Sequence, residues 1–78
     1  MKIETNGYVL KREDTGEYYC SILDSTAKAY WWDEDIDEAL VFEELEIAEL
    51  VADMLADEGF KVGIRGYRKT IEVFDTID

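Results

Sequence analysis

The segment Glu43–Glu58 is the one stretch of this chain whose apolar residues recur with the period of a helix, and it has strand-like sequence on both sides. At about 100° per residue, apolar side chains gather on one side of this helix and acidic side chains form a narrow stripe opposite. Gly59 follows where a left-handed C-cap is expected. The apolar side comprises Leu45, Ile47, Ala48, Val51, Ala52 and Leu55, and the stripe comprises Glu46, Glu49, Asp53 and Asp57.

Runs of aromatic and β-branched residues predict strands before and after the helix. Tyr8–Arg12 and Glu17–Leu23 predict a β-hairpin, with Gly16 where the turn needs a positive φ. Phe60–Arg65 and Lys69–Phe74 alternate around a Gly-Tyr pair and predict a second hairpin. The residues expected to point inward from the second hairpin are Val62, Ile64, Ile71 and Val73.

The middle of the chain is expected to connect the first hairpin to the helix. Asp24–Tyr30 reads as a loop, Asp35–Ala39 as a helical turn and Leu40–Phe42 as a short third strand. The element order is then β-β-(β)-α-β-β. We therefore predict a single α+β domain over residues 1–78, in which an antiparallel sheet of four to five strands packs against one amphipathic helix.

The net charge of this chain is concentrated in one third of its length. Twelve acidic residues and no Lys or Arg lie between Asp33 and Glu58, whereas the rest of the chain holds eight acidic and eight basic residues. The acidic segment therefore accounts for the whole net charge of −12. Such a field repels nucleic acid and anionic membranes and attracts basic surfaces. The sequence thus disfavours direct DNA or RNA binding and favours a protein partner with a basic surface.

The residue types exclude most catalytic and cofactor chemistry. The chain has no histidine, and its one cysteine, Cys20, stands in the middle of a predicted strand, so neither an intramolecular disulfide nor a Cys/His zinc site is expected. No glycine-rich phosphate loop, signal peptide or membrane-spanning run is recognisable. We expect a cytoplasmic protein that is not an enzyme, has no cofactor and buries Cys20 as a small hydrophobe.

The acidic segment contains an incomplete calcium-binding pattern. Asp33, Asp35 and Asp37 stand at positions one, three and five of a twelve-residue frame that ends at Glu44, as in an EF-hand loop. Position six, where the sharp turn of that loop requires glycine, is Glu38. The sequence therefore predicts solvated carboxylates here and no metal site.

Two adjacent tryptophans precede the acidic cluster. Neighbouring residues of an extended segment point to opposite sides, so either Trp31 or Trp32 is expected to enter the core and the other to face solvent. An exposed aromatic side chain beside charged residues is a common interface composition. We expect the outward ring to act as an apolar anchor for a partner.

Residues 7–58 resemble a pattern found in short acidic proteins of bacteriophages and prophages. The pattern consists here of YVLKR, then GEYY, then WWDEDIDEALVFEELEIAEL. The resemblance implies a viral or mobile-element origin and, with it, an inhibitor of host defence such as the anti-CRISPR and anti-restriction proteins that imitate nucleic acid. The protein would then act in the cytoplasm of the host cell.

Two hypotheses follow from the sequence. The first is a non-enzymatic, phage-type inhibitor whose acidic face binds a basic, nucleic-acid-binding groove of a host defence protein. The alternative is a structural or accessory interaction module without mimicry, in which an uncovered sheet face or a strand edge forms a homodimer or a heteromer. The residues expected to bind the partner are Trp31, Trp32, Asp33, Glu34, Asp35, Asp37, Glu38, Glu46, Glu49, Asp53 and Asp57.

Overall fold

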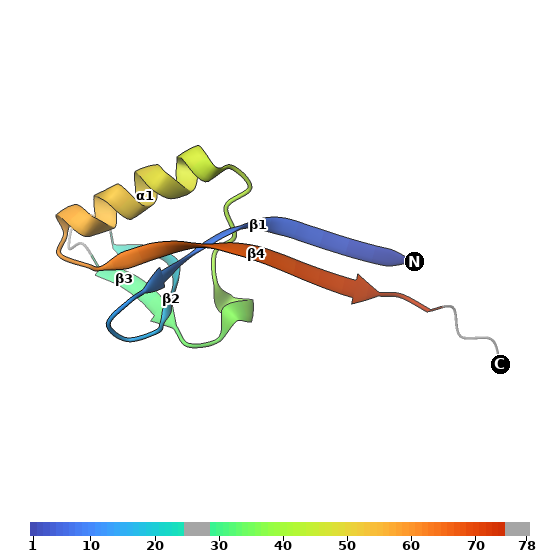
Figure 1. The fold of residues 1–78 in the computed structure, drawn as a ribbon. Helices are drawn as coiled ribbons and strands as arrows, with labels where there is room; N and C mark the ends of the chain where they lie inside the picture. The colour runs from blue at the N-terminus through green and yellow to red at the C-terminus, as the bar shows by residue number, and fades with distance from the viewer. Residues whose placement is uncertain (25–28, 75–78) are drawn as a thin grey trace.

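The computed structural model describes residues 1–24 and 29–74, and these form an antiparallel sheet covered by one helix. Within this part of the chain the strand order is β3-β2-β1-β4. The helix α1 packs on one face of the sheet, and the 3-10 turn η1 lies on the other side (Figure 1). The predicted α+β class is confirmed. The elements are β1 (Lys2–Arg12), β2 (Tyr18–Asp24), β3 (Ala29–Asp33), η1 (Ile36–Glu38), α1 (Leu45–Asp57) and β4 (Val62–Glu72).

The predicted second hairpin is wrong, because β4 is one continuous strand of 11 residues. It pairs with β1 over the whole length of both strands, from Lys2 opposite Glu72 to Arg12 opposite Val62. The reason for the error lies in the faces of β4. Val62 and Ile64 face the helix, whereas Ile71 and Val73 have the opposite parity and face the other side. The apolar residues of β4 thus occupy even positions in its first half and odd positions at its end. In a sequence, such a break in the alternation is indistinguishable from a turn between two strands.

The third strand lies earlier in the chain than expected. Leu40–Phe42 forms no strand and contributes a single bridge, between Phe42 and Tyr8. Ala29–Asp33, which contains both tryptophans, is β3 and pairs with β2 through two register shifts. Part of the predicted loop Asp24–Tyr30, residues 25–28, lies outside the described residues.

The first hairpin, the helical turn and the C-terminal end of the helix agree with the prediction, whereas α1 begins at Leu45, later than the predicted Glu43. Gly16 and Gly59 have φ values of 78° and 96°, in the left-handed region that favours glycine. η1 falls within Asp35–Ala39, and its N-cap is the side chain of Asp35, which accepts a hydrogen bond from the Asp37 amide at 2.9 Å.

The core lies between α1 and the sheet and is rich in aromatic rings. Its buried members are Leu10, Tyr19, Phe42, Ala48 and Leu55. The ring of Tyr19 lies 5.7 Å from that of Trp32 and 6.4 Å from that of Phe42. Leu45 and Ile47, predicted to be inward, are instead 42% and 46% exposed because they flank the buried stripe near the start of α1. Helix burial therefore rests on Ala48 and Leu55, supported by Val51 and Ala52.

Candidate functional site

The outer face of α1 presents the predicted acidic stripe to solvent. Glu46, Glu49, Asp53 and Asp57 are all exposed. Leu50 lies along one edge of this stripe and is 65% exposed, because the period of the helix turns it away from the buried Leu55. We call these five residues the α1 acidic face. Sequence reasoning did not include Leu50; the signal was its position one helical turn after Glu46 and one before Asp53.

The acids of this face have no cationic partner among the described residues. The ion pairs of this part of the chain lie elsewhere, on the sheet and its turns. Arg12 pairs with Asp14 at 2.9 Å, Arg65 with Glu13 at 2.7 Å, and Lys69 with Asp37 at 3.5 Å. The charge of the α1 acidic face is therefore available to an external partner.

A shallow hollow adjoins the start of α1. Its volume is about 440 Å³, and its lining combines apolar side chains with two carboxylates: Val41, Phe42, Glu43, Glu44 and Ile47. Because Ile47 is 46% exposed, apolar surface continues from the hollow onto the side of the helix. A partner lying along α1 would find here a second apolar contact bordered by negative charge.

The acidic cluster after β3 is separate from the α1 acidic face. Asp33 and Asp35 accept hydrogen bonds from the backbone amides two residues ahead, at 2.8 and 2.9 Å, so their carboxylates shape the turn that holds η1. Asp37 pairs with Lys69 of β4. Glu34 and Glu38 are exposed. Within residues 1–24 and 29–74, no group of three or more Cys, Asp or Glu side chains is arranged to hold a metal ion.

The two tryptophans divide as predicted, and neither lies beside the α1 acidic face. Trp32 is the inward one: it packs against the core under α1, and its ring lies 5.1 Å from that of Phe60. The Arg12 guanidinium covers the same indole at 5.2 Å. Trp31 is 41% exposed and, as the neighbour of Trp32 in β3, points to the face of the sheet away from α1. The predicted binding residues therefore form two surfaces, not one.

Cys20 is buried, as the sequence predicts, and it lies on the η1 side of the sheet. Its side chain is 6% exposed, and its thiol donates to the Tyr18 carbonyl at 3.4 Å. Burial raises the pKa of the Cys20 thiol, and the charges of Asp33 and Glu38 raise it further. A thiol held neutral in this way is a poor nucleophile and a poor metal ligand.

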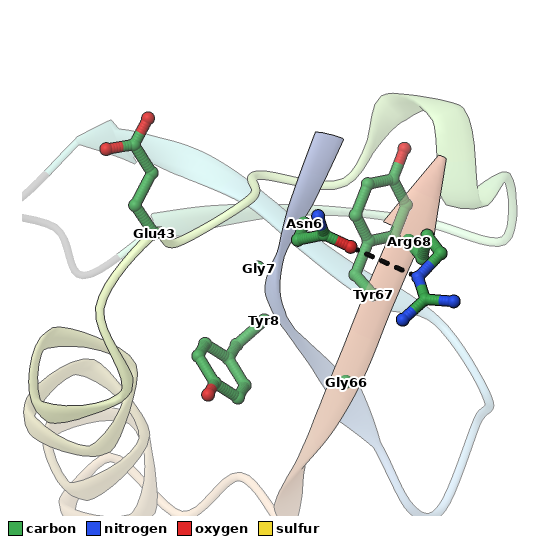
Figure 2. A pocket seen from close by; sticks show the side chains of 7 residues that line it. All are labelled: Asn6, Gly7, Tyr8, Glu43, Gly66, Tyr67 and Arg68. Atoms are coloured by element: carbon green, nitrogen blue, oxygen red, sulfur yellow. Dashed lines mark hydrogen bonds between the residues drawn. The ribbon is translucent and has the colours of Figure 1, made fainter. Parts of the chain in front are cut away.

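A second hollow, of about 480 Å³, lies where the β1–β4 ribbon leaves the body of the protein. Gly66 leaves space here, since a Cβ at this position would meet nothing within 4 Å, whereas Gly7 lies against the Phe42 backbone. In Figure 2 the surrounding side chains fan out from it instead of converging, and Arg68 donates to Asn6 at 3.2 Å. The hollow therefore lacks the convergent polar groups of a catalytic or cofactor site. Its lining residues are Asn6, Gly7, Tyr8, Glu43, Gly66, Tyr67 and Arg68.

No protein-family model matches the sequence, and neither curated proteins nor solved structures give a match. In the described part of the chain, α1 is too short and too charged to cross a membrane. The function is accordingly inferred from the surfaces of the chain itself, among which the α1 acidic face combines the most unpaired charge with an exposed apolar side chain.

Proposed function

We propose that this protein is a non-enzymatic binding protein whose α1 acidic face occupies a basic groove on a nucleic-acid-binding partner. The observation that carries the proposal is the α1 acidic face itself, where four exposed carboxylates without cationic partners in the described chain lie beside the exposed Leu50. Unpaired charge draws a basic surface in, and an apolar side chain that becomes buried keeps it bound.

The charge spacing indicates how far such a face imitates nucleic acid. Glu46 and Asp57 are eleven residues apart, or about 16 Å along the axis at ~1.5 Å per residue, so the stripe carries one charge per ~4 to 5 Å. Duplex DNA carries one per ~1.7 Å. Glu43 and Glu44 extend the charged track beyond the start of the helix. The imitation is partial, and the affinity therefore depends on apolar contact as well as on charge.

Leu50 takes the anchoring role that the sequence suggested for a tryptophan. Trp31 points to the other side of the sheet and cannot reach a partner that lies along α1, whereas Leu50 borders the acidic stripe on α1 itself. The partner expected from this arrangement is a groove with basic walls and an apolar depression at its centre. A helix lying in such a groove is an established mode of recognition.

The resemblance to small acidic phage proteins supports an inhibitor as the form of this activity. If the groove normally holds DNA or RNA, occupation by α1 displaces it and blocks the partner. The alternative, an accessory module without mimicry, shares the binding surface and differs in that the partner keeps its nucleic acid.

The experiment begins with capture from a nuclease-treated bacterial lysate, followed by kinetics with the purified partner. The double reversal Glu49→Lys/Asp53→Lys is the test variant. Glu34→Lys/Glu38→Lys is the matched control, because it changes the net charge equally but on the cluster after β3. We expect the test variant to lower the association rate about tenfold or more at low salt and much less at high salt, and the control to change it little.

Two further measurements decide between inhibitor and module. Leu50→Ala should raise the dissociation rate with little dependence on salt, because it removes apolar contact and no charge. The intact protein should release a labelled duplex from the partner, and the Glu49→Lys/Asp53→Lys variant should not. A partner that binds both charge variants equally fast contradicts the proposed face, and one that keeps its duplex in the saturated complex contradicts mimicry.

A further inference from the structure

The ends of β1 and β4 project from the body as a two-stranded arm (Figure 1). The arm consists of residues 1–6 and 68–74, all of which are exposed. A two-stranded ribbon is only marginally stable in water unless another strand or surface covers it. Within the described chain neither α1 nor β2 extends over the arm, since the β1–β2 pairing is confined to the hairpin end at Lys11 and Tyr18.

The apolar side chains of strands β1 and β4 in the arm gather on one face, toward its tip, and Thr5 and Lys69 follow on the same face nearer the body. The face that carries the apolar residues changes near Gly7 and Gly66. Tyr8 and Leu10 of β1 face α1, whereas Ile3 has the opposite parity and faces away from it. Ile3 stands directly opposite Ile71. The exposed fractions on the apolar face are 81% for Met1, 43% for Ile3, 45% for Ile71 and 42% for Val73. This face continues the side of the sheet on which Val9 is buried, at 1% exposure.

The outer edge of β1 is open along the arm. Met1 and Val73 exchange backbone hydrogen bonds at 2.9 and 2.7 Å, so the odd-numbered residues of β1 bond to β4. The backbone amides and carbonyls of the even-numbered residues of β1 point away from β4. Tyr8 is an example, since it exchanges two 2.8 Å backbone hydrogen bonds with Phe42 on the side away from β4. Lys2, Glu4 and Asn6 follow the same parity, and no strand of the described chain covers them.

We propose that the arm binds a second copy of this chain by antiparallel pairing of the two β1 edges about a two-fold axis at Ile3. In this register Lys2 stands opposite Glu4 of the second copy, and Glu4 opposite its Lys2, so both cross-strand charge pairs are attractive. Ile3 meets Ile3 of the second copy. The result is one continuous sheet with a row of four isoleucines across its centre on the side away from both α1 helices.

The charge distribution favours a second copy at this place. The arm carries Lys2, Arg68 and Lys69 against Glu4 and Glu72, whereas the body holds the acidic segment. Five residues from Ile3 to Tyr8, at ~3.3 Å each, hold each body roughly 17 Å from the axis and the two bodies roughly 33 Å apart. That distance exceeds the Debye length of ~8 Å at physiological salt. Two strongly acidic molecules thus meet through nearly neutral surfaces.

The free edge of β4 is a less suitable contact between copies when the two strands pair about Tyr67. Pairing two β4 strands about Tyr67 would place Arg65 opposite Lys69 of the second copy, on both sides of the axis. Like charges directly opposite destabilise a strand pair. Pairing about Tyr67 is therefore repulsive, whereas pairing of the β1 edges about Ile3 is attractive.

The test is sedimentation equilibrium of the full chain from about 10 µM to 1 mM at about 0.15 M salt, with circular dichroism to verify folding. We expect association to twice the monomer mass of 9.1 kDa. Glu4→Pro removes the outward amide and the carboxylate that faces Lys2 of the second copy, removes no bond to β4, and should weaken the dimer about tenfold or more. Ile71→Lys should do the same, whereas its matched control Thr70→Lys adds the same charge to the polar face and should not.

A charge exchange tests the register. Lys2→Glu and Glu4→Lys should each weaken the dimer, and the double variant Lys2→Glu/Glu4→Lys should restore it, since both pairs are again opposite in sign. A chain that stays monomeric over the whole concentration range overturns the proposal. A dimer that survives both Glu4→Pro and Ile71→Lys in folded protein overturns it equally, because its interface then lies elsewhere.

Discussion

Gly7 lies where the chain leading into α1 crosses β1, and replacing it with alanine should destabilise the fold. A Cβ at this position would lie 2.5 Å from the Phe42 carbonyl oxygen and 2.7 Å from Cγ1 of Val41. The first of these atoms belongs to the backbone, so no rotamer change can relieve the overlap. The segment before α1 must therefore move away from β1.

The cost follows from the contacts that this segment makes. The two 2.8 Å hydrogen bonds between Tyr8 and Phe42 would be stretched or lost, at about 1 kcal/mol each. Phe42, only 8% exposed, would lose part of its packing. We expect a loss of about 2–3 kcal/mol, a large share of the roughly 4–12 kcal/mol typical of a domain of this length.

Urea unfolding followed by tryptophan fluorescence measures this change, because Trp32 belongs to the core. With a slope of about 1 kcal/mol per molar urea, the midpoint for Gly7→Ala should fall by roughly 2–3 M. Gly66→Ala is the matched control: it lies one position along the same ribbon, opposite Tyr8, and its Cβ would meet nothing within 4 Å. It should be neutral or stabilising by roughly 0.5 kcal/mol, because a glycine inside a strand is replaced without strain.

Two results would refute this reasoning. If Gly7→Ala lowers stability by less than about 0.5 kcal/mol, the contact between the Phe42 segment and β1 is not as close as described. If Gly66→Ala costs as much as Gly7→Ala, the loss reflects a general need for glycine in the ribbon and not the crossing at Phe42.

Three further predictions concern charge, the thiol and calcium. The melting temperature should rise by roughly 4–8 °C between low salt and about 0.5 M NaCl as like-charge repulsion is screened. A flat or falling curve would contradict the conclusion that the carboxylates of the α1 acidic face lack cationic partners. Because its pKa is raised, native Cys20 should react with iodoacetamide at least about tenfold more slowly than unfolded chain at pH 8; equal rates contradict its burial. Calorimetric titration with calcium should show no saturable site tighter than about millimolar, and a micromolar site abolished by Asp33→Asn contradicts this.

Local sequence determined the elements whose patterns are periodic or need a special backbone. The helix follows from apolar residues at helical spacing and ends at Gly59, where only glycine adopts the required positive φ without strain. The first hairpin follows from Gly16 and two strand-like runs. The charge asymmetry, and with it the acidic stripe of α1, is likewise a property of the sequence.

Only the tertiary structure decided which faces are covered. The apolar residues of β4 change parity near Gly66, and nothing in the sequence distinguishes a turn from a strand whose two halves are covered on opposite sides. β3 was missed for a similar reason: two adjacent tryptophans show no apolar–polar alternation along the sequence. Only the contacts of Trp32 with Tyr19 and Phe60 in the folded protein determine which ring is buried. Leu50 was undecided for the same reason: the position of α1 on the sheet determines which of its apolar residues are buried, and that position is set by contacts between segments far apart in the chain.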